Sequence, residues 1–261
     1  MKPRTEQFLY TLLWTAGSLM NPTMRNLDET FEGWAYRNGL SRHLSSLEKQ
    51  RLLERSGRAK RVCRLTERGR LRALAGRDPK AGWSRRWDGW WRIVCFDVPT
   101  TENRQRRRLR HYLRNNGFGL LQRSLWVTPD PIDETVKLLK ANSPDLKSLI
   151  FFKAQSCGGE SNQDIVSTAW DFDRINRLYQ RHLQVLDQRP HGKAAAARAL
   201  LNWSELERLA WKQAVTADPL LPTALLPRNY LGRQAWLRRI QTLKQAAKEA
   251  DCLKPILIGD K

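Results

Sequence analysis

A short apolar strand followed by a long basic helix constrains the fold of this chain most. Residues 93–98 form a mainly β-branched and aromatic run that is typical of a buried strand, and Pro99, which has no amide donor for a β-ladder, ends it. Residues 101–116 are rich in arginine, and their apolar positions Leu109 and Leu113 recur at helical spacing. The pattern therefore predicts a strand that leads into an amphipathic helix.

The residues after this helix predict a return to the same sheet. Gly117 stands where the helix is expected to end, and residues 120–127 form a second extended run. Residues 131–139 then favour another helix, and residues 149–152 another strand. A strand, a crossover helix and a returning strand indicate a small α/β sandwich, which we place over residues 83–156.

The charge of the chain indicates a polyanionic partner. Among 261 residues, 47 are Lys or Arg and 26 are Asp or Glu, which gives a formal net charge of +21. Cations that neutralise phosphates release the counterions condensed on nucleic acid, and this release favours binding. A length of 261 residues also allows two or three modules, each with its own core. Nucleic acid is therefore the expected partner.

The first 78 residues have the pattern of a winged helix-turn-helix domain. Helices are predicted there over residues 8–20, 28–37 and 41–54. Leu40, Leu44 and Leu47 recur at i, i+4 and i+7 and mark the buried side of the third helix. Its outer face carries hydrogen-bond donors suited to a major groove: Ser41, Arg42, Ser45, Ser46 and Lys49.

A basic turn after this helix predicts the wing. Residues 56–61 form a turn that contains Arg58, Lys60 and Arg61, and residues 62–65 return as a strand before Thr66 caps another helix. The cations of such a turn hold phosphates without reading sequence. The alternative is that the leucines are ordinary core residues and the cations a solvated face.

Aromatic and basic side chains surround the central strand. The tryptophans before it are Trp83, Trp87, Trp90 and Trp91, and the basic stripe on the following helix is Arg107, Arg110 and Arg114. The tryptophans are suited to stacking on bases or on the adenine of a ligand, or to packing a junction between modules. The stripe is suited to the phosphates of DNA or of a ligand, or to a solvated face.

Asp97 at the end of the central strand raises a second hypothesis. Its position is similar to that of an Asp proposed to hold a divalent metal in the small CRISPR-associated adaptation proteins. A single carboxylate is a poor metal site, so a nuclease would need the symmetry-related Asp97 of a dimer. The alternative is a turn residue that hydrogen-bonds the nearby backbone.

The C-terminal part, residues 163–261, is predicted to be helical. Helices are expected over residues 165–186, 194–217 and 233–250. Residues 218–232 contain three prolines and therefore form a connector that cannot be one continuous helix.

The cysteines and the N-terminus favour a reducing cytoplasm. The four cysteines lack the close spacing of a metal knuckle or of a disulfide scaffold: Cys63, Cys95, Cys157 and Cys252. The apolar stretch at residues 8–20 follows Lys2 and Arg4, but its periodicity is that of an amphipathic helix rather than of a signal peptide. No run is long enough to span a bilayer, and we expect no metal and no cofactor.

The order of these parts resembles a known family. The segments that carry the resemblance are Trp90 to Pro99, Gly117-Phe118-Gly119 with the strand to Trp126, Trp170-Asp171, and Asp218 to Pro222 with Leu225-Leu226-Pro227 and Gly232. Together they resemble the PaaX family of bacterial transcriptional repressors. The resemblance implies a winged helix-turn-helix, a ferredoxin-like central sandwich similar to the CRISPR adaptation fold, and a helical C-terminal domain.

The resemblance also implies a function. A homodimer would bind a partly palindromic double-stranded DNA operator and leave it when an aromatic acyl-CoA, such as phenylacetyl-CoA, binds. The central domain would dimerise, the C-terminal domain would help to sense the effector, and no enzymatic activity is expected. The candidate effector-binding residues are Trp87, Trp90, Arg107, Arg110 and Arg114. A metal-dependent nuclease that uses Asp97 and a nucleic-acid-binding protein without an effector are the alternatives.

The chain departs from the family pattern at three places. Val62-Cys63 stand where the wing strand usually has an aromatic residue, Ser46 where an Arg is common, and Tyr230 where a Trp is customary. The first two leave the operator sequence open. Tyr230 can fill much of the same space as a tryptophan.

Overall fold

The computed structural model forms two compact units. One contains residues 1–78, 178–216 and 232–261, and the other contains residues 79–177 and 217–231. The structure describes residues 41–56, 62–73, 76–96, 103–133, 136, 149–156, 159–190 and 197–253. The helices expected before residue 41, the tip of the expected wing and Asp97 lie outside these residues.

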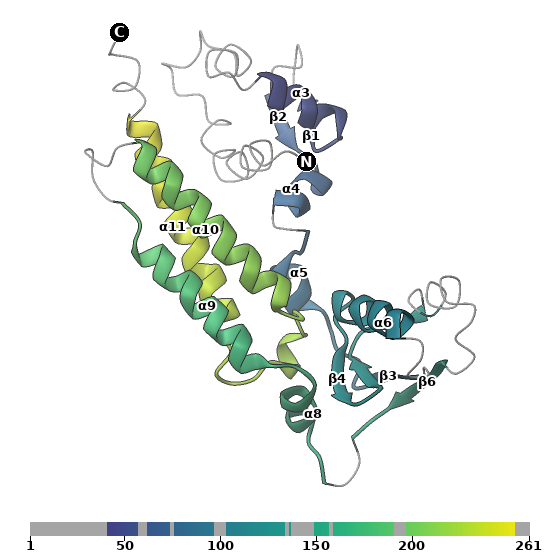
Figure 1. The fold of residues 1–261 in the computed structure, drawn as a ribbon. Coiled ribbons are helices and arrows are strands. Elements are labelled where there is room, and N and C mark those ends of the chain that lie inside the picture. The colour runs from purple at the N-terminus through teal and green to yellow at the C-terminus, as the bar shows by residue number, and fades with distance from the viewer. Residues whose placement is uncertain are drawn as a thin grey trace. The chain divides into compact units, whose positions relative to one another are not determined.

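The first described segment joins a helix to a hairpin. Its elements are α3 (Ser41–Lys49), β1 (Leu53–Ser56), β2 (Val62–Leu65) and α4 (Glu67–Ala73) (Figure 1). The strands are antiparallel, with Leu53 opposite Leu65 and Ser56 opposite Val62. Leu44 and Leu47 of α3 are buried, as their spacing predicts.

The helix α3 is shorter than predicted. Arg51 has a φ of 55°, and the amide of Leu52 donates to the carbonyl of Leu47 at 2.9 Å. This left-handed residue and reversed hydrogen bond form a Schellman-type helix end. Glycine or asparagine usually stands at such a position, and arginine gives no sequence signal for it. The prediction of a helix to residue 54 was therefore wrong.

A close backbone contact fixes the hairpin against α4. The hydroxyl of Thr66 accepts a hydrogen bond from the amide of Gly69 at 3.0 Å, which confirms the predicted helix cap. It also donates to the carbonyl of Arg51 at 2.9 Å. A Cβ atom on Gly69 would lie 2.0 Å from the carbonyl oxygen of Leu52, so only glycine fits there.

The second unit contains a four-stranded antiparallel sheet. Its elements are α5 (Pro79–Ser84), β3 (Trp91–Phe96), α6 (Asn103–Asn115), β4 (Gly119–Gln122), β5 (Leu125–Thr128), β6 (Leu149–Ala154) and α8 (Asn162–Ala169). The strand order is β4-β5-β3-β6, which is the order of a ferredoxin-like sheet. The extended run predicted at residues 120–127 is a hairpin instead, because Arg123 adopts a φ of 43° between β4 and β5.

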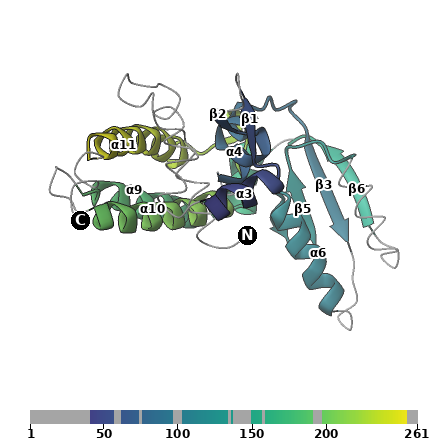
Figure 2. The ribbon, with the colours of Figure 1, turned by 90° about the horizontal axis from the view of Figure 1, so that it is seen from above.

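Helix α6 covers one face of this sheet (Figure 2). Leu109 and Leu113 pack against Val94, Phe96 and Trp126 in one apolar cluster. The helix ends at Gly117, whose φ is 82°, and the amide of Phe118 donates to the carbonyl of Leu113 at 3.0 Å. The predicted strand, helix and helix-ending glycine are confirmed. Most of the helix expected at residues 131–139 lies outside the described residues.

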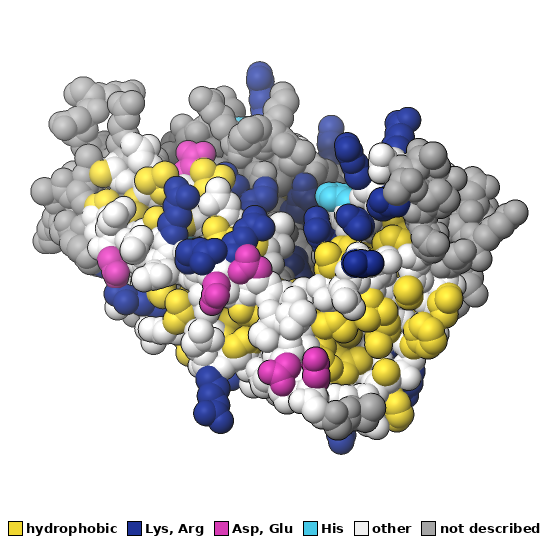
Figure 3. Space-filling view, turned by 60° about the horizontal axis from the view of Figure 1, so that its bottom comes forward, with side chains coloured by type: hydrophobic (Ala, Val, Ile, Leu, Met, Phe, Trp, Pro, Cys, Tyr) yellow, Lys and Arg dark blue, Asp and Glu magenta, His cyan; other side chains and the backbone are white. Residues whose placement is uncertain are grey.

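The opposite face of the sheet is apolar and partly open. Side chains alternate along β3, so Ile93 and Cys95 point away from α6. On the edge strand β6, Phe152 stands beside Ile93 and Ile150 beside Cys95. Ile150 is 52% exposed and Phe152 is 51% exposed. Figure 3 shows a broad hydrophobic area on one face of the molecule.

The C-terminal helices are α9 (Phe172–Asp187), α10 (Ala197–Ala217) and α11 (Gly232–Leu253), which lie side by side (Figures 1 and 2). The helix predicted over residues 165–186 is broken into α8 and α9. The carboxylate of Asp171 accepts from the amide of Arg174 at 2.8 Å and caps α9, which explains the break. The helices predicted at residues 194–217 and 233–250 are confirmed as α10 and α11.

The proline-rich connector packs within the second unit. It contains only the short 3-10 helix η4 (Thr223–Leu225), as its prolines predict. The hydroxyl of Tyr230 donates to Asp218 and accepts from Nε1 of Trp83 at 3.0 Å. An indole cannot accept that second bond, so Tyr230 provides an interaction that the customary tryptophan would not.

A buried ionisable cluster links the three C-terminal helices. His182 of α9, Glu207 of α10 and Arg239 of α11 are each 0% exposed. Oε1 of Glu207 accepts from Nε2 of His182 at 2.9 Å and from Nε of Arg239 at 2.7 Å. The Arg239 guanidinium also lies 4.6 Å from the centre of the Trp211 ring. Burial lowers the pKa of His182, and the Glu207 carboxylate only partly offsets this.

We expect His182 to make the fold sensitive to acid. Because the folded-state pKa lies below the unfolded value of about 6.5, its contribution to stability is complete above pH 6.5 and falls as the pH drops toward the folded pKa. The free energy of unfolding should lose up to about 1.4 kcal/mol per pH unit from this one proton. Urea denaturation between pH 5 and 7.5 measures the slope.

The control compares two histidines. His182→Gln should flatten this part of the pH dependence, whereas His111→Gln, at an exposed position of α6, should leave it unchanged. Equal slopes for the wild type and His182→Gln would contradict the assignment.

Candidate nucleic-acid interface

The outer face of α3 is polar and accessible. Arg42, Ser45 and Lys49 are exposed at i, i+3 and i+7, on the side away from the buried Leu44 and Leu47. Their spacing places them on one side of a helix about 13 Å long. The side chain of Ser41 is not described.

Ser46 differs from the other candidates on α3. It is only half-buried, and its hydroxyl accepts a hydrogen bond from Nε2 of Gln50 at 3.0 Å. The hydroxyl hydrogen of Ser46 can still donate to an additional partner. The candidate wing residues Arg58, Lys60 and Arg61 lie outside the described part of the chain, in the segment that connects the paired ends Ser56 and Val62.

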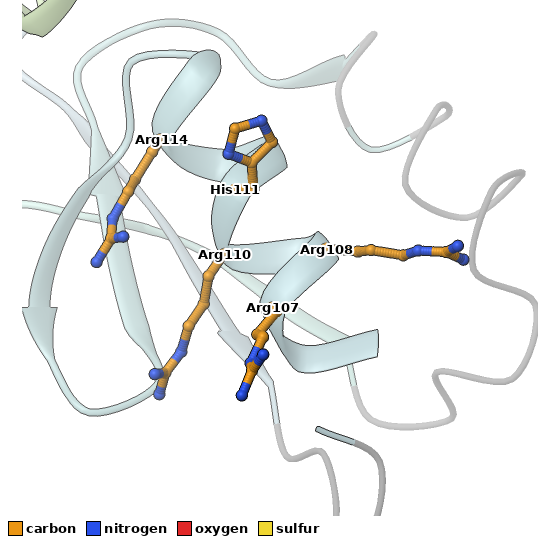
Figure 4. Close-up of a pocket in the computed structure, with 5 residues that line it drawn as sticks. All are labelled: Arg107, Arg108, Arg110, His111 and Arg114. Atoms are coloured by element: carbon orange, nitrogen blue, oxygen red, sulfur yellow. The ribbon is translucent and has the colours of Figure 1, made fainter. Parts of the chain in front are cut away.

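The structure brings the predicted arginine stripe together on α6. Arg107, Arg110 and Arg114 extend to one side of the helix, and Arg108 points away from them (Figure 4). These four arginines and His111 border an open hollow of about 570 Å³. The guanidinium carbon of Arg114 lies 5.7 Å from the centre of the Trp126 ring, which steadies that side chain. Sequence reasoning missed Arg108 and His111, although both belong to the same basic helix.

The candidate tryptophans make contacts of their own. Nε1 of Trp87 donates to the carbonyl of Trp90 at 3.0 Å, and its ring centre lies 5.3 Å from that of Trp91. The ammonium of Lys153 lies 4.6 Å from the centre of the Trp90 ring. Trp91 is buried, and its Nε1 donates to Asn162 at 2.9 Å. The described residues that border the hollow beside α6 do not include Trp87 or Trp90.

An ion pair fixes the backbone next to these tryptophans. Both terminal nitrogens of the Arg92 guanidinium contact the carboxylate of Asp88, at 2.7 and 2.6 Å. The hydrogen bond from Arg92 is the main reason that the pKa of Asp88 falls to about 2. The same arginine donates to the carbonyl oxygens of Trp90 and Pro129, so it joins the start of β3 to the end of β5.

Within the described ranges, no group of three or more His, Cys, Asp or Glu side chains is placed to hold a metal ion. Asp97, the candidate metal ligand, lies outside the described ranges. The described helices also include none with the length and apolar character needed to cross a membrane.

Comparison with known proteins identifies the family. The family model of the PaaX protein central Cas2-like domain matches residues 84–166, and that of the PaaX-like protein C-terminal domain matches residues 170–252. No curated protein matches the chain. Among solved structures, the uncharacterized protein Rv0674 from Mycobacterium tuberculosis is similar in fold, with a TM-score of 0.50 and 22% identity over 83% of this chain and 84% of that chain.

The two matched segments follow one another along the chain and together include the sheet, α6, the connector and the C-terminal helices. Members of this family are regulators that bind DNA, and the family is generally regulatory rather than enzymatic. The chain belongs to the PaaX family.

Proposed function

We propose that this protein is a DNA-binding transcriptional repressor whose helix α3 enters the major groove. The observation that carries the proposal is the polar, exposed face of α3 beside an antiparallel hairpin. A major groove is about 12 Å wide and admits one helix. Arg42 and Ser45 would contact base edges, and Lys49 would contact the backbone or a base.

The hairpin is the expected wing of this domain. Arg58, Lys60 and Arg61, in its connecting segment, would hold phosphates and fix the position of α3 in the groove. The net charge of +21 and the DNA-binding character of the family support this assignment. A bacterial repressor binds genomic DNA in the cytoplasm. The dispersed cysteines agree with this reducing location.

The central unit would pair two copies of the chain. The open sheet face presents Ile150 and Phe152 to solvent beside Ile93 and Cys95, and a second sheet would remove this apolar surface from water. Pairing would bring two copies of α3 to one operator, as the two half-sites of a partly palindromic operator require.

The effector would be an acyl-CoA-type molecule. Its phosphates suit Arg107, Arg110 and Arg114, and its rings suit Trp87 and Trp90. Release of DNA requires that the effector bind more tightly to a state of the dimer whose two recognition helices no longer match the operator.

The recognition helix and the wing are distinguished by their substitutions. Arg42→Ala and Ser45→Ala should change the order of preference among selected duplexes. The wing triple variant Arg58→Ala, Lys60→Ala and Arg61→Ala should weaken binding to all duplexes and reduce the slope of log K against log salt by about 0.9 for each lost phosphate contact. Duplex selection followed by salt titration measures both.

Exposed Lys244 on α11 provides the control, since Lys244→Ala should change neither property. An unchanged salt slope in the wing variant would contradict the assignment of the wing. Cleavage of the bound duplex when magnesium is added would favour a nuclease instead.

Charges on the open sheet face should dissociate the dimer. Ile150→Glu and Phe152→Glu together place two carboxylates at positions that are half exposed in the single chain, so folding should survive while pairing is lost. Analytical ultracentrifugation should show the molar mass fall from that of a dimer to that of one chain.

Leu206→Glu and Leu237→Glu, at exposed positions on α10 and α11, are the matched control and should leave the mass unchanged. A dimer that persists in the sheet variant would rule out this face.

A further inference from the structure

The ionisable side chains of α6 include many cations and no carboxylate. Its 13 residues include six arginines and a histidine and contain no carboxylate. Leu109 and Leu113 are buried on the sheet, and every exposed position of the helix is polar or charged. Like charges three or four residues apart on a helix repel one another and destabilise it. The arrangement therefore opposes the stability of α6 unless an anion binds it.

Three arginines of α6 have no ion-pair partner among the described residues. Arg107, Arg110 and Arg114 form no ion pair with any described carboxylate, and Nε of Arg110 is shielded from solvent without a hydrogen-bond partner among the described residues. Elsewhere in the same unit, Arg85 pairs with Asp130 at 3.0 Å and Arg92 with Asp88 at 2.6 Å. Among the described residues, the unit thus pairs Arg85 and Arg92 beside the sheet but gives Arg107, Arg110 and Arg114 no carboxylate partner.

The geometry of the stripe suits a duplex backbone. Arg107 and Arg114 are separated by about 10 Å along the helix axis. A duplex rises about 3.4 Å per phosphate on each strand, and its minor groove is about 6 Å wide, so the stripe can meet several phosphates along one strand or on both sides of this groove. The planar guanidinium matches phosphate oxygens better than an ammonium does.

The composition of the exposed face favours nucleic acid over a membrane. Surface helices that bind lipid place apolar side chains beside their cations, whereas the exposed residues of α6 are Asn, Arg and His only.

We infer that α6 is a second DNA-binding surface, which holds the phosphodiester backbone of the duplex while α3 contacts bases. The inference rests on the proposed DNA-binding function and extends it to the central unit. It also has a regulatory consequence. A ligand with several phosphates that binds the same arginines competes with DNA for them, so the effector weakens operator binding directly as well as through the geometry of the dimer.

The test compares two arginine triplets in the full-length protein. One variant carries Arg107→Gln, Arg110→Gln and Arg114→Gln. The control carries Arg174→Gln, Arg177→Gln and Arg181→Gln, which have the same spacing on α9, are exposed and remove the same charge. Helix α9 contains the carboxylate of Asp173 in its first turn, whereas α6 contains no carboxylate within its own residues. Binding of a selected duplex is measured between 50 and 300 mM KCl.

The α6 variant should lose about 2–3 units from the slope of log K against log salt, and its affinity at 100 mM KCl should fall about tenfold or more. Its order of preference among duplexes should not change, because phosphate contacts carry no sequence information. The control should lose less than about half a unit. A third variant with lysine at the three α6 positions should recover most of the slope, which excludes a folding defect.

Two results would overturn the inference. One is an α6 variant whose salt slope equals that of the control, although the wild type binds duplex. The proposed recognition function of α3 would then stand without this second surface. The other is an α6 variant that keeps its slope but no longer binds coenzyme A in calorimetry, since the arginines would then serve a small phosphorylated ligand alone. A wild type without affinity for any duplex would overturn the proposed function together with this inference.

Discussion

The packing of Leu109 and Leu113 against the sheet determines what the central unit presents to its surroundings. These two side chains join Val94, Phe96 and Trp126 in a closed apolar cluster, and the helix cannot rotate without exposing them. Because α6 is fixed in this way, its arginines must face outward, and the sheet residues that alternate with Val94 must face the opposite side. The basic helix face and the apolar sheet face are thus two consequences of one buried contact.

Local sequence signals predicted those helix ends that use the expected residues and failed at the others. Gly117 and Arg51 end α6 and α3 with the same reversed hydrogen-bond pattern, but only the glycine could be recognised. Arg123 likewise gave no sequence signal for the turn between β4 and β5, where it adopts a positive φ. An arginine adopts a left-handed conformation only where neighbouring contacts stabilise it, and those contacts are set by the tertiary structure rather than by the residue type.

The candidate site was predictable to the extent that it depends on helical periodicity. The outward position of Arg42, Ser45 and Lys49 and the common side of Arg107 and Arg114 follow from spacing alone. Contacts between distant segments did not follow from it. The position of Lys153 over Trp90 depends on the register of β6 against β3, and the cluster of His182 with Glu207 depends on how two helices pack. The roles of the wing cations and of Asp97 remain predictions, because these residues lie outside the described part of the chain.

Hydroxyl-radical footprinting of the full-length protein on genomic duplexes that it retains at low salt tests the central claim most directly. The account predicts two protected half-sites separated by about one helical turn of DNA, or a multiple of it, on a duplex that remains intact with magnesium present. Absence of protection on every genomic fragment in dilute buffer, or cutting of the duplex within the bound region, would contradict it.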